Sequence, residues 1–245
     1  MKSLSRAILL LGLGLVTLAP SSATKYELVY DYLGKTSVYH QYLQGTIEGK
    51  AGPEKIHLQF LRNAQITALA GNKYLLKEWG QKYQGSQINF SEFDLPGPGE
   101  QLERTVTKYG KVTSVMRYLK GHRYYFRWLV FPEKPIEPGK DWSYDYPINF
   151  DVFGKSVRSK CTVNYTLERV MNYKKHLSAK ILAQGQCAGR QGPAQLHYDF
   201  ENKIFFDIDQ GREVDYQINL TWTKSDSKKN LQESAKIEIY SILEK

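Results

Sequence analysis

A strict alternation of apolar and polar residues constrains this chain more than any other feature. In the stretch 213–222 every second residue is apolar. The apolar positions are Val214, Tyr216, Ile218, Leu220 and Trp222, and the polar ones are Glu213, Asp215, Gln217, Asn219 and Thr221. Successive side chains of a β-strand point to opposite faces, so the pattern predicts a strand with one buried and one wet face. Such strands belong to antiparallel sheets that are covered on one side.

The same alternation recurs along the chain, while helical periodicity is nearly absent beyond the first 23 residues. It predicts a strand around Ile56, Leu58 and Phe60, and a first strand over 26–32. Turn signals rich in Gly and Pro follow at regular intervals, which is typical of hairpin connections. We therefore predict an all-β fold, an antiparallel meander that forms a strongly curved sheet or an open barrel.

The first 23 residues have the three parts of a secretory signal peptide. Lys2 and Arg6 precede an apolar run at 7–19, and small residues ending in Ala23 follow it. A transmembrane anchor is the alternative, but the run is shorter than the ~20 residues that span a bilayer. We predict a signal peptide helix, cleavage near Ala23, and export to the periplasm or beyond as a soluble protein without a transmembrane segment.

The charge of the chain limits its partners only loosely. The net charge is +9, and it falls to +7 when Lys2 and Arg6 leave with the signal peptide. A positive charge favours an anionic neighbour, such as lipid head groups or acidic polysaccharide, but it can equally serve solubility alone. Nucleic acid is not an expected partner for an exported protein.

A proline-rich stretch at 131–142 divides the remaining β-rich domain, residues 24–245. Pro132, Pro135 and Pro138 each lack a backbone N–H, so the stretch cannot be a paired central strand. We predict a connection there between an N-terminal half, 24–130, and a C-terminal half, 143–245. Scattered identities at an offset of 101 residues make a distant duplication of the two halves one interpretation.

Cys161 and Cys187 are the two cysteines of the chain, and an exported protein can join them in one disulfide. If a hairpin turns in a five-residue loop centred on Lys174, the two cysteines face each other. Facing residues of antiparallel strands are close enough for such a bond. The same register pairs Leu167 with Ile181 and Met171 with Leu177. A redox-active or metal-binding pair is the alternative, but no CxxC spacing supports it.

Catalytic and metal-binding motifs are missing from the sequence. The five histidines form no HxH, HxxxH or HExxH pair, and no nucleophile motif or phosphate-binding loop occurs. We therefore predict no catalytic residue, no metal ligand and no cofactor. An enzyme remains an alternative only if its residues converge in space.

One segment, 117–128, mixes basic and aromatic residues. It predicts a patch for anionic sugars or head groups, where rings stack and bases pair with the anion. The candidate residues are Arg117, Lys120, Arg123, Arg127 and Trp128. The alternative is an ordinary hairpin turning at 120–121, with its aromatic side chains directed inward.

The proline-rich connection, with Gly139 and Trp142 after it, resembles exported bacterial domains of unknown function. The likeness continues through 165–167, 179–181 and 211–212, and covers about residues 130–222. It implies an envelope protein with a β-sheet domain and no assigned activity. The predicted architecture is also similar to periplasmic lipid-handling folds, in which a curved sheet cups an apolar ligand.

These observations favour a non-enzymatic protein of the cell envelope that binds or carries a ligand, lipophilic in one version, in a curved β-sheet. The alternative is a structural or interaction module that docks another envelope protein. A carrier predicts an apolar cavity, whereas a docking module predicts a filled core and an apolar surface patch.

Overall fold

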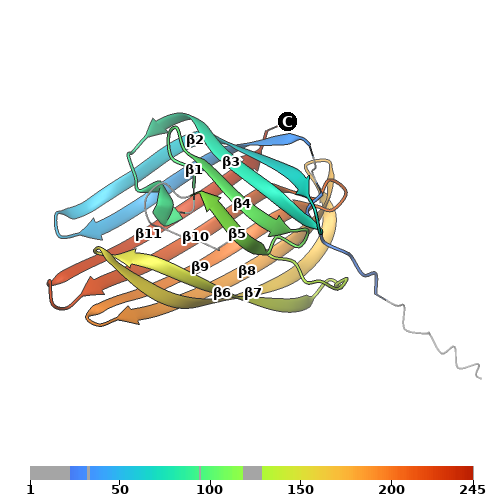
Figure 1. The fold of residues 1–245 in the computed structure, drawn as a ribbon. Helices are drawn as coiled ribbons and strands as arrows, with labels where there is room; N and C mark the ends of the chain where they lie inside the picture. Colours follow the sequence, from blue (N-terminus) through green and yellow to red (C-terminus); the bar gives the residue numbers. More distant parts are fainter. Residues whose placement is uncertain (1–22, 32–33, 94, 118–128, 245) are drawn as a thin grey trace, which may run out of the picture.

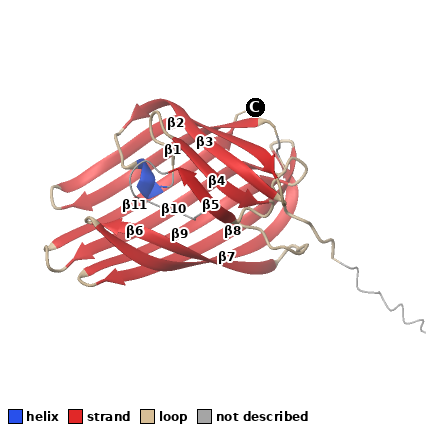
Figure 2. Ribbon diagram, viewed as in Figure 1, coloured by secondary structure: helices blue, strands red, loops and turns tan. Residues whose placement is uncertain are grey.

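A computed structural model describes residues 23–31, 34–93, 95–117 and 129–244. Within these residues, eleven antiparallel strands form one curved sheet that does not close on itself (Figure 1). The strands are β1 (Thr36–Gly49), β2 (Gly52–Leu69), β3 (Lys73–Gly85), β4 (Gln101–Thr107), β5 (Val112–Arg117), β6 (Lys140–Val152), β7 (Lys155–Tyr173), β8 (His176–Gln191), β9 (Ala194–Asp207), β10 (Arg212–Asp226) and β11 (Leu231–Leu243). A short 3₁₀ helix, η1 (Phe90–Phe93), interrupts the strands of the described chain (Figure 2). The predicted all-β antiparallel meander is confirmed.

The sheet joins two meanders through the first and last strands. Its order is β5-β4-β3-β2-β1-β11-β10-β9-β8-β7-β6, so every neighbouring pair is consecutive in the chain except β1 with β11. The predicted proline-rich connection leads from β5 toward β6, the two edges of the sheet, and β6 already begins at Lys140. The sheet runs without a break through β1 and β11, and the duplication of its halves stays a prediction.

Buried side chains define the inner face of the sheet, and its alternating pattern agrees with the sequence. In β10 the predicted stripe is buried, with Ile218 and Leu220 fully covered. One position in that stretch differs from the prediction: Glu213, expected on the wet face, is buried. A β-bulge between Glu213 and Asp215 interrupts the alternation there.

The first predicted strand is wrong. Residues 23–31 run outside the sheet, with a single bridge between Tyr26 and Ile136. Their backbone bonds instead to several separate segments, from Tyr30 N to the Lys108 carbonyl and from Asp31 N to the Gly211 carbonyl. The alternating pattern arises because Leu28 and Tyr30 pack into the core, not because the segment pairs as a strand.

The predicted disulfide is confirmed. Cys161 of β7 and Cys187 of β8 lie directly opposite each other, with Cα atoms 4.2 Å apart, and both are buried on the inner face. The predicted register holds from this pair as far as Leu167 opposite Ile181. The sequence pattern was therefore sufficient to align the two strands over their central part.

Beyond that point the predicted register is wrong by one residue. Met171 lies opposite Ser178 and not opposite Leu177, because β7 has a bulge just after Leu167. The shift replaces the predicted five-residue loop by a two-residue turn, Lys174–Lys175. Both turn residues have positive φ angles, 48° and 72°. Positive φ at both central residues is typical of the tight turns that match the twist of a hairpin.

The predicted signal peptide lies outside the described residues except for Ala23. Within the part of the chain that the structure describes, no helix has both the length and the apolar character needed to cross a membrane.

Candidate functional site

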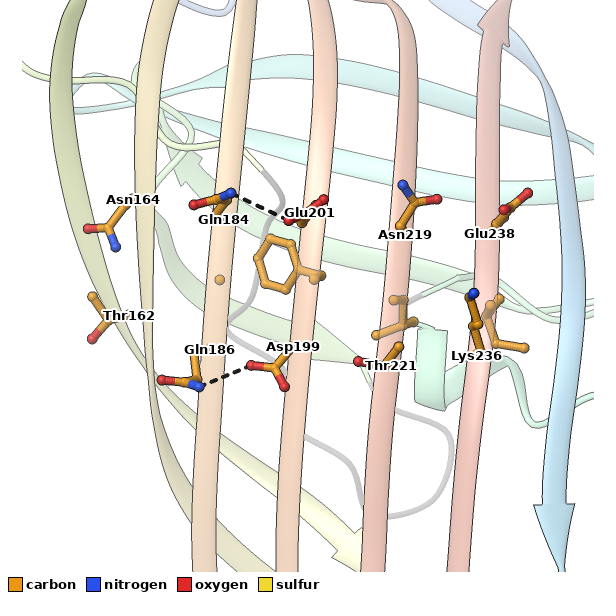
Figure 3. A pocket seen from close by; sticks show the side chains of 14 residues that line it. Thr162, Asn164, Gln184, Gln186, Asp199, Glu201, Asn219, Thr221, Lys236 and Glu238 are labelled. Atoms are coloured by element: carbon orange, nitrogen blue, oxygen red, sulfur yellow. Dashed lines mark hydrogen bonds between the residues drawn. The ribbon is translucent and has the colours of Figure 1, made fainter.

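A polar trough lies on the outer face of the sheet, across β7 to β11 (Figure 3). It is an open cavity of about 690 Å³. Ten polar side chains line it in two rows. The glutamate row consists of Asn164, Gln184, Glu201, Asn219 and Glu238, and the lysine row consists of Thr162, Gln186, Asp199, Thr221 and Lys236.

Strand register produces these rows. Gln184 lies opposite Asn164 on one side and opposite Glu201 on the other, and the same alignment continues across β10 to Glu238. The lysine row lies two residues away along each strand, and therefore on the same face. Between the rows the floor is formed by residues whose side chains belong to the inner face, such as Leu220 and Ile237.

Two hydrogen bonds across neighbouring strands fix the centre of the trough (Figure 3). Gln184 Nε2 donates to Glu201 at 3.4 Å, and Gln186 Nε2 donates to Asp199 at 3.2 Å. Asp199 also contacts His197 Nε2, at 2.7 Å. These contacts hold an amide beside a carboxylate in each row.

The edge of the trough toward β1 is fixed in the same way. Glu238 accepts hydrogen bonds from Gln44 at 2.8 Å and from the hydroxyl of Tyr240 at 3.0 Å. These two bonds, that of Gln44 first, hold the pKa of Glu238 below its usual range. Glu238 is therefore ionised at neutral pH.

Four side chains of the trough form no hydrogen bond with any described protein group. They are Asn164 and Asn219 in the glutamate row and Thr221 and Lys236 in the lysine row. All four are exposed. Their donors and acceptors face water and are available to a ligand, beside the paired amides and carboxylates that are already in place.

A second polar group, which the sequence did not predict as a cluster, lies buried on the inner face. Arg62 Nη1 donates to Glu78 at 3.0 Å and Arg62 Nη2 to Glu213 at 3.3 Å, and Arg104 lies 3.6 Å from Glu78. Burial alone would lower the pKa of Arg62, but electrostatic interactions with Tyr216 and with the two glutamates outweigh it and raise that pKa.

Among the described residues, two arginines and two glutamates pair in this buried charge cluster, which joins β2, β3, β4 and β10. Balanced, buried pairs of this kind hold elements in register more than they bind ligands. A signal was present in the sequence, because Arg62 continues the apolar positions Ile56, Leu58 and Phe60 at the same spacing of two. A charged residue in such a position requires a buried partner, which the sequence alone does not identify.

The predicted anionic patch is not assembled by the described residues. Arg117 is the last residue of β5, while Lys120, Arg123, Arg127 and Trp128 lie outside the described residues. The patch stays a prediction. Of the predicted site residues, the structure brings together Cys161 and Cys187.

The histidines of the described chain do not gather. His176 Nδ1 lies 2.6 Å from Asp207, and His40 lies 3.5 Å from Glu244, at separate places on the sheet. In the described ranges, no three His, Cys, Asp or Glu side chains come close enough to hold a metal ion.

Neither the known protein-family models nor the curated protein sequences contain a match to this chain. The likeness to exported bacterial domains therefore stays an expectation, and the function has to be inferred from the geometry of the site.

Proposed function

We propose that this is a non-enzymatic binding protein of the cell envelope whose curved sheet holds a polar ligand in the outer trough. The proposal rests on the trough: ten polar side chains from five strands line one open cavity, and four of them lack a hydrogen-bond partner in the described chain. Concave sites with a few convergent polar groups are where ligands bind most often.

Binding is favoured over catalysis by the state of the carboxylates. Asp199 is partly exposed and paired with Gln186 and His197, while Glu238 is held ionised by its hydrogen bonds. A general acid needs the opposite, a carboxyl whose pKa is raised by burial. The trough supplies hydrogen bonds in fixed positions, which suits recognition.

In one version of the prediction from sequence, the ligand is lipophilic and lies on the apolar side of the curved sheet. The inner-face side chains are already covered by the protein, and Val163, Ile181 and Ile218 have no exposed surface. An apolar ligand would have to displace these contacts, whereas the trough is open. We therefore propose that the ligand binds on the outer face. The native mass spectrometry experiment described below distinguishes a polar ligand from a lipid.

Docking of another envelope protein receives less support. The large apolar side chains exposed in the described chain include Tyr42 of β1 and Leu182 of β8. Three strands, β9 to β11, separate them in the sheet. An apolar docking patch requires such residues to be contiguous.

The proposal includes export of the protein from the cytoplasm. The bond between Cys161 and Cys187 supports it, because structural disulfides persist in oxidising compartments outside the cytoplasm. Cleavage near Ala23 is checked by the mass of the protein recovered from the envelope or the medium.

Native mass spectrometry tests the function. The exported protein is mixed with a cell-envelope extract, and bound compounds are identified. We expect a polar compound that the Gln184→Ala/Asn219→Ala variant no longer retains and that the Gln59→Ala variant still retains. Gln59 is a matched control, because it lies on β2, outside the trough, and is hydrogen-bonded to Gln84. A lipid retained equally by all three proteins would contradict the proposal.

A further inference from the structure

We infer that the ligand of the trough is an uncharged glycan chain that lies across strands β7 to β11. The inference rests on the proposed function and adds the chemical class of the ligand.

The shape of the trough suits an extended chain. Each row crosses five neighbouring strands, so it is about 19 Å long at ~4.8 Å per strand spacing, and the two rows are separated by about 6.7 Å. Polar groups recur at every strand along this length (Figure 3). A compact small molecule would use only part of such a row, whereas a chain of sugar rings meets a new pair of side chains at each strand.

The chemistry of the rows suits hydroxyl groups. Amide side chains such as Asn219 both donate and accept, carboxylates such as Glu201 accept, and the hydroxyl of Thr221 does both. A sugar hydroxyl also donates and accepts, so it can bridge an amide and the carboxylate beside it. The bond between Gln184 and Glu201 holds such a pair in place before the ligand arrives. Preorganised groups lose less entropy on binding.

The charges in the trough argue against anionic chains. Three carboxylates, Asp199, Glu201 and Glu238, line it beside one cation, Lys236. Like charges repel nucleic acid, acidic polysaccharide and phosphate head groups. We therefore do not expect the predicted anionic partner to bind in the trough. The separate prediction of an anionic patch at 117–128 is unaffected.

Peptides and polycations are also less well matched. An extended peptide binds a sheet by adding a strand to an edge, but the trough lies on the face of β7 to β11, whereas the edges are β5 and β6. A polycation would need free carboxylates. Asp199 is already paired with His197, and Glu238 accepts from both Gln44 and Tyr240.

The ten polar side chains that line the trough include no aromatic ring, and the one aromatic residue of the lining, Phe200, belongs to the buried core of the inner face. Affinity then comes from several hydrogen bonds, each of which contributes little. Binding should consequently depend on chain length, because a longer glycan reaches more strands.

The experiment is an NMR titration of the mature protein with defined probes. Cellohexaose, maltohexaose and chitohexaose are each compared with their disaccharides, and a galacturonate hexamer and spermine represent anionic and cationic ligands. We expect at least one neutral hexasaccharide to shift backbone amide signals of β8 to β11 and to bind at least tenfold more tightly than its disaccharide. The Asn219→Ala variant should weaken that binding at least fivefold, and Gln59→Ala should not change it.

The Asn219 side chain is exposed and has no hydrogen-bond partner in the part of the chain that the structure describes, so its truncation should leave the fold intact. Unshifted signals of the inner-face residues will verify this. The inference is overturned if the neutral hexasaccharides leave the trough signals unshifted, or if Asn219→Ala binds them unchanged. If spermine or the galacturonate hexamer binds in the trough instead, the inference of a neutral glycan is wrong, whereas the proposed binding function still holds. Both the glycan inference and the proposed function are wrong if two results coincide. None of the probes shifts the amide signals of the trough, and the Gln184→Ala/Asn219→Ala variant still retains the ligand found by native mass spectrometry.

Discussion

Arg62 of β2 and Glu213 at the start of β10 form a buried ion pair, 3.3 Å between Nη2 and Oε2, although 151 residues separate them in the chain. The pair spans β1 and β11, where the two meanders of the sheet join. Tyr30 of the N-terminal segment donates its hydroxyl hydrogen to the same glutamate or to the Leu129 carbonyl, at 3.3 and 3.2 Å. One glutamate thus connects three distant parts of the chain.

Replacing Arg62 by Met should lower the free energy of unfolding by about 3–5 kcal/mol, because it removes the cation that pairs with the buried carboxylates of both Glu78 and Glu213. Urea unfolding of the variant measures the change. The double variant Arg62→Met/Glu213→Gln should recover part of the loss, since it also removes the buried charge of the carboxylate that pairs with Arg62 Nη2. Equal stability of the single variant and the wild type would show that the cluster is not a structural requirement.

Removing the disulfide in a Cys161→Ala/Cys187→Ala variant should cost up to about 3.5 kcal/mol of unfolding free energy, from the closure of a loop of about 27 residues. Residual hairpin in the unfolded chain would reduce that figure. The measurement is urea unfolding of the variant beside the wild type with and without dithiothreitol. Two free thiols in the exported, untreated protein would refute the bond itself.

The stability of the protein should fall in acid through Asp226. Its pKa is held below its usual range, chiefly by the hydrogen bond from Lys155 at 2.7 Å and further by the backbone N–H groups of Lys229 and Lys228. Because the folded pKa lies below the unfolded value of about 3.9, the contribution is complete above that pH and is lost as pH falls through the folded pKa.

The Asp226→Asn variant checks this origin. Its Tm should lie below that of the wild type at pH 7, and the gap should narrow as the pH falls below the unfolded pKa of about 3.9 and then through the lower pKa of the folded state. A gap that stays constant over this range would mean that the charge of Asp226 is not what stabilises the turn between β10 and β11.

Asn202 of β9 is a buried amide whose oxygen and nitrogen have no hydrogen-bond partner among the described residues. It lies on the inner face, opposite Ala183 and Ile218. Replacing it by Leu, which has a similar volume, should raise the free energy of unfolding by about 1–2 kcal/mol, because an unsatisfied buried polar group is costly. Thermal and urea unfolding measure the change. A lower stability would instead indicate a buried water bound to the amide.

Local patterns were enough to predict the strands and one long-range bond. The alternation around Ile218 and the facing positions of Cys161 and Cys187 follow from the two-residue period of a strand, which depends only on neighbours in sequence. The bulge after Leu167 was not predictable in this way. It depends on how the turn at Lys174–Lys175 closes, and one extra residue shifts every pair beyond it.

In the N-terminal segment, the local pattern predicted a strand that the structure does not contain. Tyr26, Leu28 and Tyr30 follow each other at the two-residue spacing of a strand, but the backbone of this segment bonds to three separate parts of the chain, at Ile136, Lys108 and Gly211. Alternation reports that one side of an extended chain is buried, and it does not reveal what the backbone bonds to. Sequence alone could not separate these two cases.

The sequence by itself determined that the chain forms alternating antiparallel strands, that one face of each strand is buried, and that its two cysteines meet. Only the tertiary structure decided which polar faces lie side by side. Asn164, Glu201 and Glu238 share a row because β7 to β11 are aligned in register, over separations of 37 residues or more. The burial of Arg62 against Glu213 likewise required the curve of the whole sheet. Such contacts depend on strand order and curvature, which no local pattern contains.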